Sequence, residues 1–524
     1  MAVSPALDTA GATPRARPAP PAPAPRRTGL TGRTGLTGRA VVGLVPAGLT
    51  LALGLWGIRR ENSMWRDEST TYQVAHRSVA DIWQLLGQAD VAHGLYYLLM
   101  HGVFALWDGG LVALRLPSVL AMAAAAAGVG LLGRRLAGPR AGLAAGLVFP
   151  LAPAVQRYAQ EGRSYALVCA AVVAATHLLL SAVARPRKRT WAGYAAVASL
   201  ACLLHEFAIL AVVAHGVALY RARVGARFGW AWGQAASVVA VVLAPLVIVS
   251  QQQAALVGWI SPPGPPELLG FGALALVGLG CARGPLPARG PVPLRDLALG
   301  LLILPPAALL AVSYLHPLYV DRYVLYAYVG LALLIGARLD ALSRTAVVPG
   351  ALAGGLAVAA VAALLPYSLQ LRTPQSRLDD PLAAARAVRE LSRPGDGVLF
   401  LPARRREPVM SRPGDFRGLR ELALARHAIP SGTLHGIELP APLIRARMLT
   451  AGRIVTVNDP PGQPLDDTSQ ERVKREVLAE HFHRCAVRDV TGMRIVLYGR
   501  EGKWREGTRR AGERREGKWR AGTC

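Results

Sequence analysis

Two adjacent carboxylates, Asp67 and Glu68, stand in the segment SMWRDEST (63–70), shortly after an apolar run over residues 40–58. A carboxylate placed beside a hydroxyl group can take its proton and act as a general base. Ionisable side chains at the edge of a bilayer are energetically expensive and are functional candidates by default. The two side chains are therefore candidates for acid–base chemistry.

Three other segments place charged and aromatic side chains at the predicted ends of apolar runs. They are DVAHGLYY (90–97), RYAQEGRSYA (157–166) and HPLYVDRYVLY (316–326). The predicted threading brings all three to the same side of the membrane as the acid pair. The candidate site residues that they contribute are His93, Tyr96, Arg157, Glu161, Arg163, Arg322 and Tyr323.

One or two carboxylates together with an arginine suit transfer of a sugar from a lipid-phosphate donor. The leaving group is a phosphate, whose developing charge is stabilised by a cation such as arginine. The acceptor hydroxyl needs a base, which a positioned Asp supplies. A single displacement of this kind inverts the anomeric centre. No cofactor is required, although paired acids can also hold a divalent cation, and the sequence indicates no metal site.

Each candidate also has a purely structural interpretation. Asp67 could cap the N-terminus of a helix, which is a common position for Asp. Glu161 could form an interfacial ion pair with Arg157 or Arg163. Arg322 could be an anchor that extends to the membrane surface beside an aromatic belt.

The composition indicates a membrane protein. Hydrophobic residues make up 52% of the 524 residues and charged residues only 17%, whereas ordinary globular domains have about 25% charged residues. The net charge of +27 does not indicate nucleic-acid binding, because the basic residues gather in the tails and in short groups between apolar runs. Basic residues beside apolar runs are typical of loops that flank membrane spans.

The apolar runs predict an α-helical polytopic membrane protein with about eleven transmembrane helices. The predicted spans are 40–58, 114–132, 141–156, 165–184, 190–206, 207–220, 230–250, 267–282, 296–313, 323–338 and 346–366. Alternate loops, such as 133–140 and 185–189, carry several basic residues, whereas 251–266 carries none. Basic loops stay in the cytoplasm, so we expect a plasma-membrane protein with a cytoplasmic N-terminus.

This threading keeps residues 59–113 outside as the first external loop, within a transmembrane domain over 40–366. The apolar stretch 93–107 then forms an amphipathic helix in the outer interface, because a span there would reverse every later loop. A short or re-entrant span is the alternative.

A small extracytoplasmic α/β domain is predicted over residues 367–499. The stretch 379–391 begins with Asp and Pro and has helical apolar spacing. Strands are predicted at 398–402, 452–457 and 493–499, with a helix near 469–480. Residues 1–39 and the basic tail 500–524 are predicted to be disordered, because their compositions cannot form a core.

Several of these motifs occur together in one family. The acid pair after the first span, LYYLL, LRLPS (114–118), the 157–167 segment and the late RY (322–323) resemble those of polytopic, polyprenyl-phosphate-sugar-dependent glycosyltransferases of the GT-C fold. The chain is most similar to the bacterial, actinobacterial relatives of dolichyl-phosphate-mannose protein mannosyltransferases. This resemblance covers about residues 40–370.

The resemblance implies roles for the candidates. Asp67 would be the catalytic base, Glu68 its helper and Glu161 a second acid that contacts acceptor or donor sugar. The residues implied to hold the lipid phosphate are Arg322, Tyr323 and Arg163; those implied to contact substrate are His93, Tyr96 and Arg157. His93 stands one position later than the family histidine, which weakens the correspondence there.

The resemblance implies a polyprenyl-phosphate sugar donor, with mannose expected ahead of arabinose or aminoarabinose. The acceptor would be a glycan, a glycolipid or a protein, reached in contact with the lipid bilayer. A lipid-linked polysaccharide polymerase or ligase, an inactive scaffold of the same fold and a polytopic transporter are the alternatives. A transporter would place its ionisable residues near the middle of the membrane, whereas these lie at loop edges.

Overall fold

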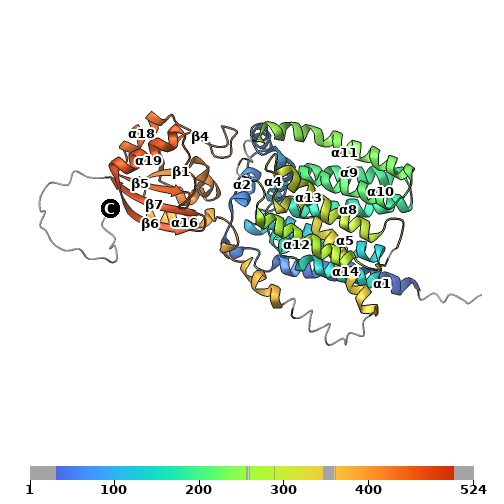
Figure 1. Cartoon of the computed structure of the whole chain (residues 1–524). Coiled ribbons are helices and arrows are strands. Elements are labelled where there is room, and N and C mark those ends of the chain that lie inside the picture. Colours follow the sequence, from blue (N-terminus) through green and yellow to red (C-terminus); the bar gives the residue numbers. More distant parts are fainter. Residues whose placement is uncertain are drawn as a thin grey trace, which may run out of the picture.

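The computed structural model describes residues 31–254, 258, 260–287, 289–345, 359 and 362–500. Figure 1 shows a bundle of helices beside a smaller domain in which helices pack around a sheet, with α2 between the two parts. The predicted fold class, a helical membrane protein with a small C-terminal α/β domain, is confirmed.

The bundle is built from helices that match the predicted spans. Their bounds are α1 Thr31–Leu55, α5 Leu111–Leu136, α6 Pro139–Leu151, α7 Pro153–Ala159, α8 Tyr165–Ala184, α9 Lys188–Leu204, α10 Ile209–Arg221, α11 Ala226–Gln252, α12 Pro265–Ala282, α13 Leu294–Ser313 and α14 Ala327–Thr345. The predicted span 141–156 is broken between α6 and α7, where Pro153 begins a new helix.

Six helical segments among the described residues are long and apolar enough to cross a membrane: Gly38–Asn62, Leu111–Leu136, Tyr165–Ala184, Ala226–Gln252, Pro265–Ala282 and Leu294–Ser313. The total of eleven spans stays a prediction, because the other matching helices are shorter or less apolar and most of 346–366 lies outside the described residues. One boundary was wrong. Residues 31–39, predicted to be disordered, form the first turns of α1, because the proline-rich stretch ends before them.

The loop between α1 and α5 is mostly helical. It contains η1 Arg60–Asn62, α2 Arg66–Ala75, α3 Val79–Leu86, η2 Val91–His93 and α4 Gly94–Leu106. The predicted helix at 93–107 is therefore present, with 13 residues in α4, and its position in the membrane interface stays a prediction.

Glycines allow three helices of the bundle to touch through their backbones. A methyl group at Gly142 of α6 would lie 2.4 Å from the carbonyl oxygen of Gly130 in α5. A methyl group added at Gly133 of α5 would likewise collide with the Cα of Gly142. On α14, a methyl group at Gly336 would lie 2.5 Å from the backbone nitrogen of Ala145. Small residues make such close packing possible where lipid supplies no hydrophobic driving force.

We predict that Gly142→Ala destabilises the bundle, because the added methyl group collides with the α5 backbone. Overpacking of this kind costs about 1–3 kcal/mol. The matched control is Gly233→Ala in α11, where a methyl group has open space around it. Thermal unfolding of the purified protein should show a clear fall in Tm for Gly142→Ala alone, and an equal Tm for both variants would contradict the prediction.

The C-terminal domain is a five-stranded sheet covered on both faces. Its strands are β1 Gly397–Leu401, β2 Arg420–Glu421, β5 Arg453–Asn458, β6 Phe482–Val490 and β7 Met493–Arg500, and they lie in the order β2-β1-β5-β7-β6. β1 is parallel to both β2 and β5, whereas β7 is antiparallel to β5 and β6. A separate hairpin pairs β3 Leu424–Arg426 with β4 Ile437–Glu438.

Alternating side chains of β1 enter two cores. Val398 and Phe400 pack with α16 Pro381–Leu391, and Leu399 packs with α18 Ala441–Leu449 and α19 Ser469–His481. Successive strand residues point to opposite faces, so a strand buried on both sides is apolar throughout. The short elements η7 Ala403–Arg406, α17 Glu407–Ser411 and η8 Pro413–Phe416 follow β1.

Candidate active site

The C-terminal domain caps the helix that carries the two adjacent acids. Asp379 accepts a hydrogen bond of 2.7 Å from the backbone nitrogen of Arg66, and Asp380 accepts one from the backbone nitrogen of Met64. Asp380 also caps its own helix, α16. The first backbone donors of a helix have no partner within the helix and need acceptors of this kind. The position of Asp67 is therefore fixed partly from the C-terminal domain.

Glu68 is fully buried in an ion-pair network. Arg115 of α5 binds both of its carboxylate oxygens at 2.7 Å, and Arg60 approaches one of them at 3.4 Å. The backbone nitrogen of Gly162 also donates a hydrogen bond of 3.1 Å to Oε1 of Glu68. Burial by itself would raise the pKa of the Glu68 carboxyl, but the two guanidinium groups outweigh it and hold the pKa at about 2. Glu68 is ionised at every physiological pH.

The turn before α2 is strained and is held by the same network. Arg60, Glu61 and Asn62 have φ values of 44°, 53° and 58°. Residues other than glycine enter this left-handed region at an energetic cost and persist there only when surrounding contacts fix them. Arg60 is fixed by Glu68 and by a hydrogen bond of 2.6 Å to the carbonyl oxygen of Gln160.

Asp67 faces Arg322. Its Oδ2 lies 3.4 Å from Nη2 of Arg322, and the two side chains are 17% and 13% exposed. The pair therefore remains within reach of a substrate, in contrast to Glu68. The alternative that Asp67 caps α2 is wrong, because the N-cap is Trp65 and Asp67 lies within the first helical turn.

Aromatic rings surround the guanidinium group of Arg322. The carbon Cζ lies 5.7 Å from the ring centroids of Trp65, Tyr165 and Tyr323, and Nε donates to the hydroxyl of Tyr165 at 3.1 Å. Tyr323 in turn packs against His205, with ring centroids 4.4 Å apart. A cation over aromatic faces is held in place without losing its charge. Arg322 lies inside the site and does not extend along the surface.

Glu161 lies in the loop between α7 and α8 and is paired with the C-terminal part of the chain. Its Oε2 is 3.6 Å from Nε of Arg377, so the expected pairing with Arg157 or Arg163 was wrong. Neither carboxylate oxygen has a hydrogen bond among the described residues, and the side chain is buried. Burial raises the pKa of Glu161, although the charge of Arg377 opposes this shift.

The remaining predicted residues fall on the margins of the same cluster. Arg163 is buried and donates to the hydroxyls of Thr71 and Tyr97. His93 packs against the ring of His205, and burial lowers its pKa, so that it is neutral. The other two are Tyr96, which is fully buried in the core of the bundle, and Arg157, which is half-buried beside Tyr158.

The sequence did not single out five residues that complete the site. These are Arg60, Trp65, Arg115, His205 as a ring partner, and Arg377. Arg115 had a usable signal, because it is a charge in the first predicted turns of a long apolar span. Arg377 had none, since its partner is distant in the sequence. Among the residues described, no group of three or more His, Cys, Asp or Glu side chains is arranged to hold a metal ion.

Comparison with known proteins supports one class. Residues 94–249 match the family model described as dolichyl-phosphate-mannose-protein mannosyltransferase. A search of curated proteins by sequence gives no match.

Two solved structures share the fold of nearly the whole chain. ArnT from Cupriavidus metallidurans in the apo state has a TM-score of 0.56 and 11% sequence identity, covering 89% of this chain and 98% of that one. The same protein bound to undecaprenyl phosphate has a TM-score of 0.54 and 12% identity, covering 88% and 98%. At these identities the likeness establishes the fold.

The fold and the family match together indicate a multi-pass membrane glycosyltransferase of the GT-C fold. Within that class, residues 94–249 match the family model of the dolichyl-phosphate-mannose-protein mannosyltransferases, and this segment carries Glu161 and Arg163. The resemblance predicted from the sequence is thereby confirmed.

We predict that Arg115→Met strongly destabilises the protein, because it leaves the buried charge of Glu68 without its main partner. Removing one partner of a buried ion pair typically costs about 3–5 kcal/mol. The matched control is Arg140→Met, an exposed arginine at the start of α6. The measurement is the fraction of monodisperse protein that survives heating in detergent.

A second variant separates charge from packing. Glu68→Gln combined with Arg60→Met and Arg115→Met removes all three buried charges and should recover part of the stability that Arg115→Met loses. If Arg115→Met and Arg140→Met behave alike, the buried network does not hold the site together.

Proposed function

We propose that the protein transfers a sugar from a polyprenyl-phosphate donor to an acceptor hydroxyl, with Asp67 as the general base. The observation that carries this proposal is the contact between Asp67 and Arg322, which brings a carboxylate and a guanidinium group together from two distant parts of the chain. Both are partly exposed, so both remain available to substrates.

Arg322 suits the phosphate of the donor. An arginine binds phosphate through charge-assisted hydrogen bonds, and its aromatic neighbours, including Tyr323, hold it in one orientation. Binding of undecaprenyl phosphate by ArnT, which has the same fold, supports a lipid-phosphate donor. The phosphate takes over the contact of Arg322 and thereby releases the carboxylate of Asp67 for proton transfer.

The chemical step is one displacement. The acceptor oxygen forms a bond to the anomeric carbon while the bond from that carbon to the phosphate oxygen breaks. The hydroxyl proton passes to Asp67, and the electron pair of the broken bond stays on the lipid phosphate beside Arg322. The anomeric configuration is inverted.

The other two acids have different roles in this proposal. Glu68 does not touch substrate, because both of its oxygens are bound to arginines; it positions α2, and with it Asp67. Glu161 has buried oxygens that lack hydrogen bonds within the described protein, so it accepts hydrogen bonds from sugar hydroxyls. His93, Tyr96 and Arg157 support the site from its margins, and Arg163 is assigned to the donor phosphate.

The proposal places the site on the extracytoplasmic face of the plasma membrane, with the N-terminus in the cytoplasm. The alternation of basic loops supports this orientation. Mannose is the proposed sugar, supported by the family match over 94–249, and the acceptor is a glycan, a glycolipid or a protein.

Asp67→Asn should abolish transfer, because the amide cannot accept the hydroxyl proton. Loss of a general base lowers the rate by about 10²–10⁴-fold. The assay offers several labelled polyprenyl-phosphate sugars to membranes that contain the wild-type protein or the variant. The variant should insert and purify as the wild type does. Full activity would remove Asp67 from the role of base, and transport without transfer by the wild type would favour a transporter.

Arg322→Gln should lower kcat by about 10²–10³-fold, because the developing charge on the phosphate loses its cation. The matched control is Arg221→Gln, whose side chain is 63% exposed and pairs with Asp296 at the far end of α10. Kinetics at varied donor concentration provide the test. An unchanged kcat in Arg322→Gln would exclude this arginine from stabilising the leaving group.

A further inference from the structure

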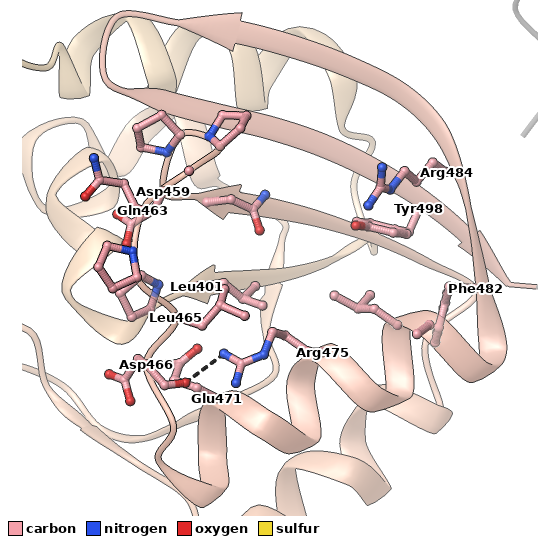
Figure 2. Close-up of a pocket in the computed structure, with 18 residues that line it drawn as sticks. Leu401, Asp459, Gln463, Leu465, Asp466, Glu471, Arg475, Phe482, Arg484 and Tyr498 are labelled. Carbon is pink, nitrogen blue, oxygen red and sulfur yellow. Dashed lines mark hydrogen bonds between the residues drawn. The ribbon is translucent and has the colours of Figure 1, made fainter.

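A pocket of about 440 Å3 opens in the C-terminal domain, at the carboxyl ends of the parallel strands β1 and β5 (Figure 2). The chain leaves β1 towards β2 on one side and leaves β5 towards β6 and β7 on the other. Ligands of open α/β sheets bind at such switch points, beyond the carboxyl ends of the strands. The volume lies within the range of about 300–1,000 Å3 that is usual for small-molecule sites.

The walls of the pocket are largely fixed before any ligand binds. One wall is the loop 459–466, DPPGQPLD, in which three prolines restrict the backbone. The opposite side is formed by the paired strands β6 and β7, where Arg484 and Tyr498 are direct cross-strand neighbours. Leu465, in the proline-rich loop, is 70% exposed.

The pocket lining contains a buried carboxylate oxygen, on Glu471, that receives no hydrogen bond from the described residues. Glu471 is 2% exposed, and its Oε1 accepts from the backbone nitrogen of Ala403 and from Nζ of Lys474. Its Oε2 has no hydrogen-bond partner among the described residues. A buried oxygen without a partner is costly, so this atom favours a ligand that donates a hydrogen bond.

The charges of the lining favour a neutral ligand. Three carboxylates, Asp459, Asp466 and Glu471, face two guanidinium groups, Arg475 and Arg484. Asp459 is paired with Arg404 and Arg405, and Arg475 donates to the carbonyl oxygen of Asp466, as the dashed line in Figure 2 marks. The carboxylates are already compensated by neighbouring cations, including Lys474 beside Glu471, so a ligand needs no charge of its own to fill this pocket.

Hydroxyl groups fit the remaining polar atoms. A sugar hydroxyl can donate to Glu471 and accept from Arg484 or from the amide of Gln463, and the apolar faces of sugar rings can pack on Tyr498 on one side and on Leu465 on the other. We infer that this pocket binds a neutral saccharide segment of the glycan that receives the transferred sugar. This inference rests on the proposed function, and among the proposed acceptors it selects a glycan.

A chain of polar contacts joins the pocket to the candidate base. Asp459 binds Nε of Arg405, Nη1 of Arg405 lies 3.7 Å from Asp379, and Asp379 accepts the hydrogen bond from the backbone nitrogen of Arg66. Arg66 precedes Asp67 directly. A glycan bound in the pocket is therefore held by the same domain whose Asp379 positions Arg66 and, next to it, Asp67.

The test measures binding of fluorescent neutral tetrasaccharides of mannose, glucose and galactose to the full chain in nanodiscs. At least one of them should bind the wild type, and the double variant Gln463→Ala, Arg484→Ala should bind it at least tenfold more weakly. The matched control is Arg488→Ala, an exposed arginine of the same strand outside the pocket lining. Asp67→Asn should bind the saccharide as the wild type does.

Two results would overturn the inference. One is that no tetrasaccharide binds, or that binding is equal in the double variant and in Arg488→Ala. The other is that a fluorescent serine- and threonine-rich peptide binds instead and is lost in the double variant. Saccharide binding is measured without donor, so the inference about the pocket can fail while the proposed sugar transfer still holds. Conversely, loss of transfer in Asp67→Asn does not change saccharide binding in the pocket.

Discussion

The buried carboxylate of Glu68, held between Arg115 and Arg60, is the interaction on which the site depends. It ties α5, the strained turn before α2 and the loop at Gly162 to one point. Taking three charges out of water is expensive, so this arrangement is stable only while every partner is present. The network therefore acts as a single unit. Its function is to fix where α2 begins and how it is rotated.

The rotation of α2 explains why two adjacent acids have different surroundings. Consecutive residues of an α-helix point about 100° apart, because one turn takes 3.6 residues. When Glu68 points into the bundle towards Arg115, Asp67 must point to the side, where Arg322 lies. Arg115 and Arg60 keep Glu68 ionised despite its burial, whereas Asp67 keeps an exposed edge. Sequence adjacency alone does not distinguish a buried, arginine-bound acid from a partly exposed one.

Periodicity and capping predicted the elements that depend on local sequence. The bounds of α8 agree with the predicted span, and α16 begins after the expected aspartate cap. The strand β6 was missed because polar residues on its exposed side hide the alternation. The contact of Glu161 with Arg377 was missed for another reason. Long-range ion pairs depend on how whole domains dock, and no short segment encodes them.

The capping of α2 by Asp379 and Asp380 has a consequence for biosynthesis. The acceptors for Met64 and Arg66 are synthesised more than 300 residues after the groups they bind. A nascent chain therefore lacks a completed α2 until its last domain has been synthesised and has folded against the helical bundle. The surroundings of Asp67 are thereby completed only at the end of synthesis.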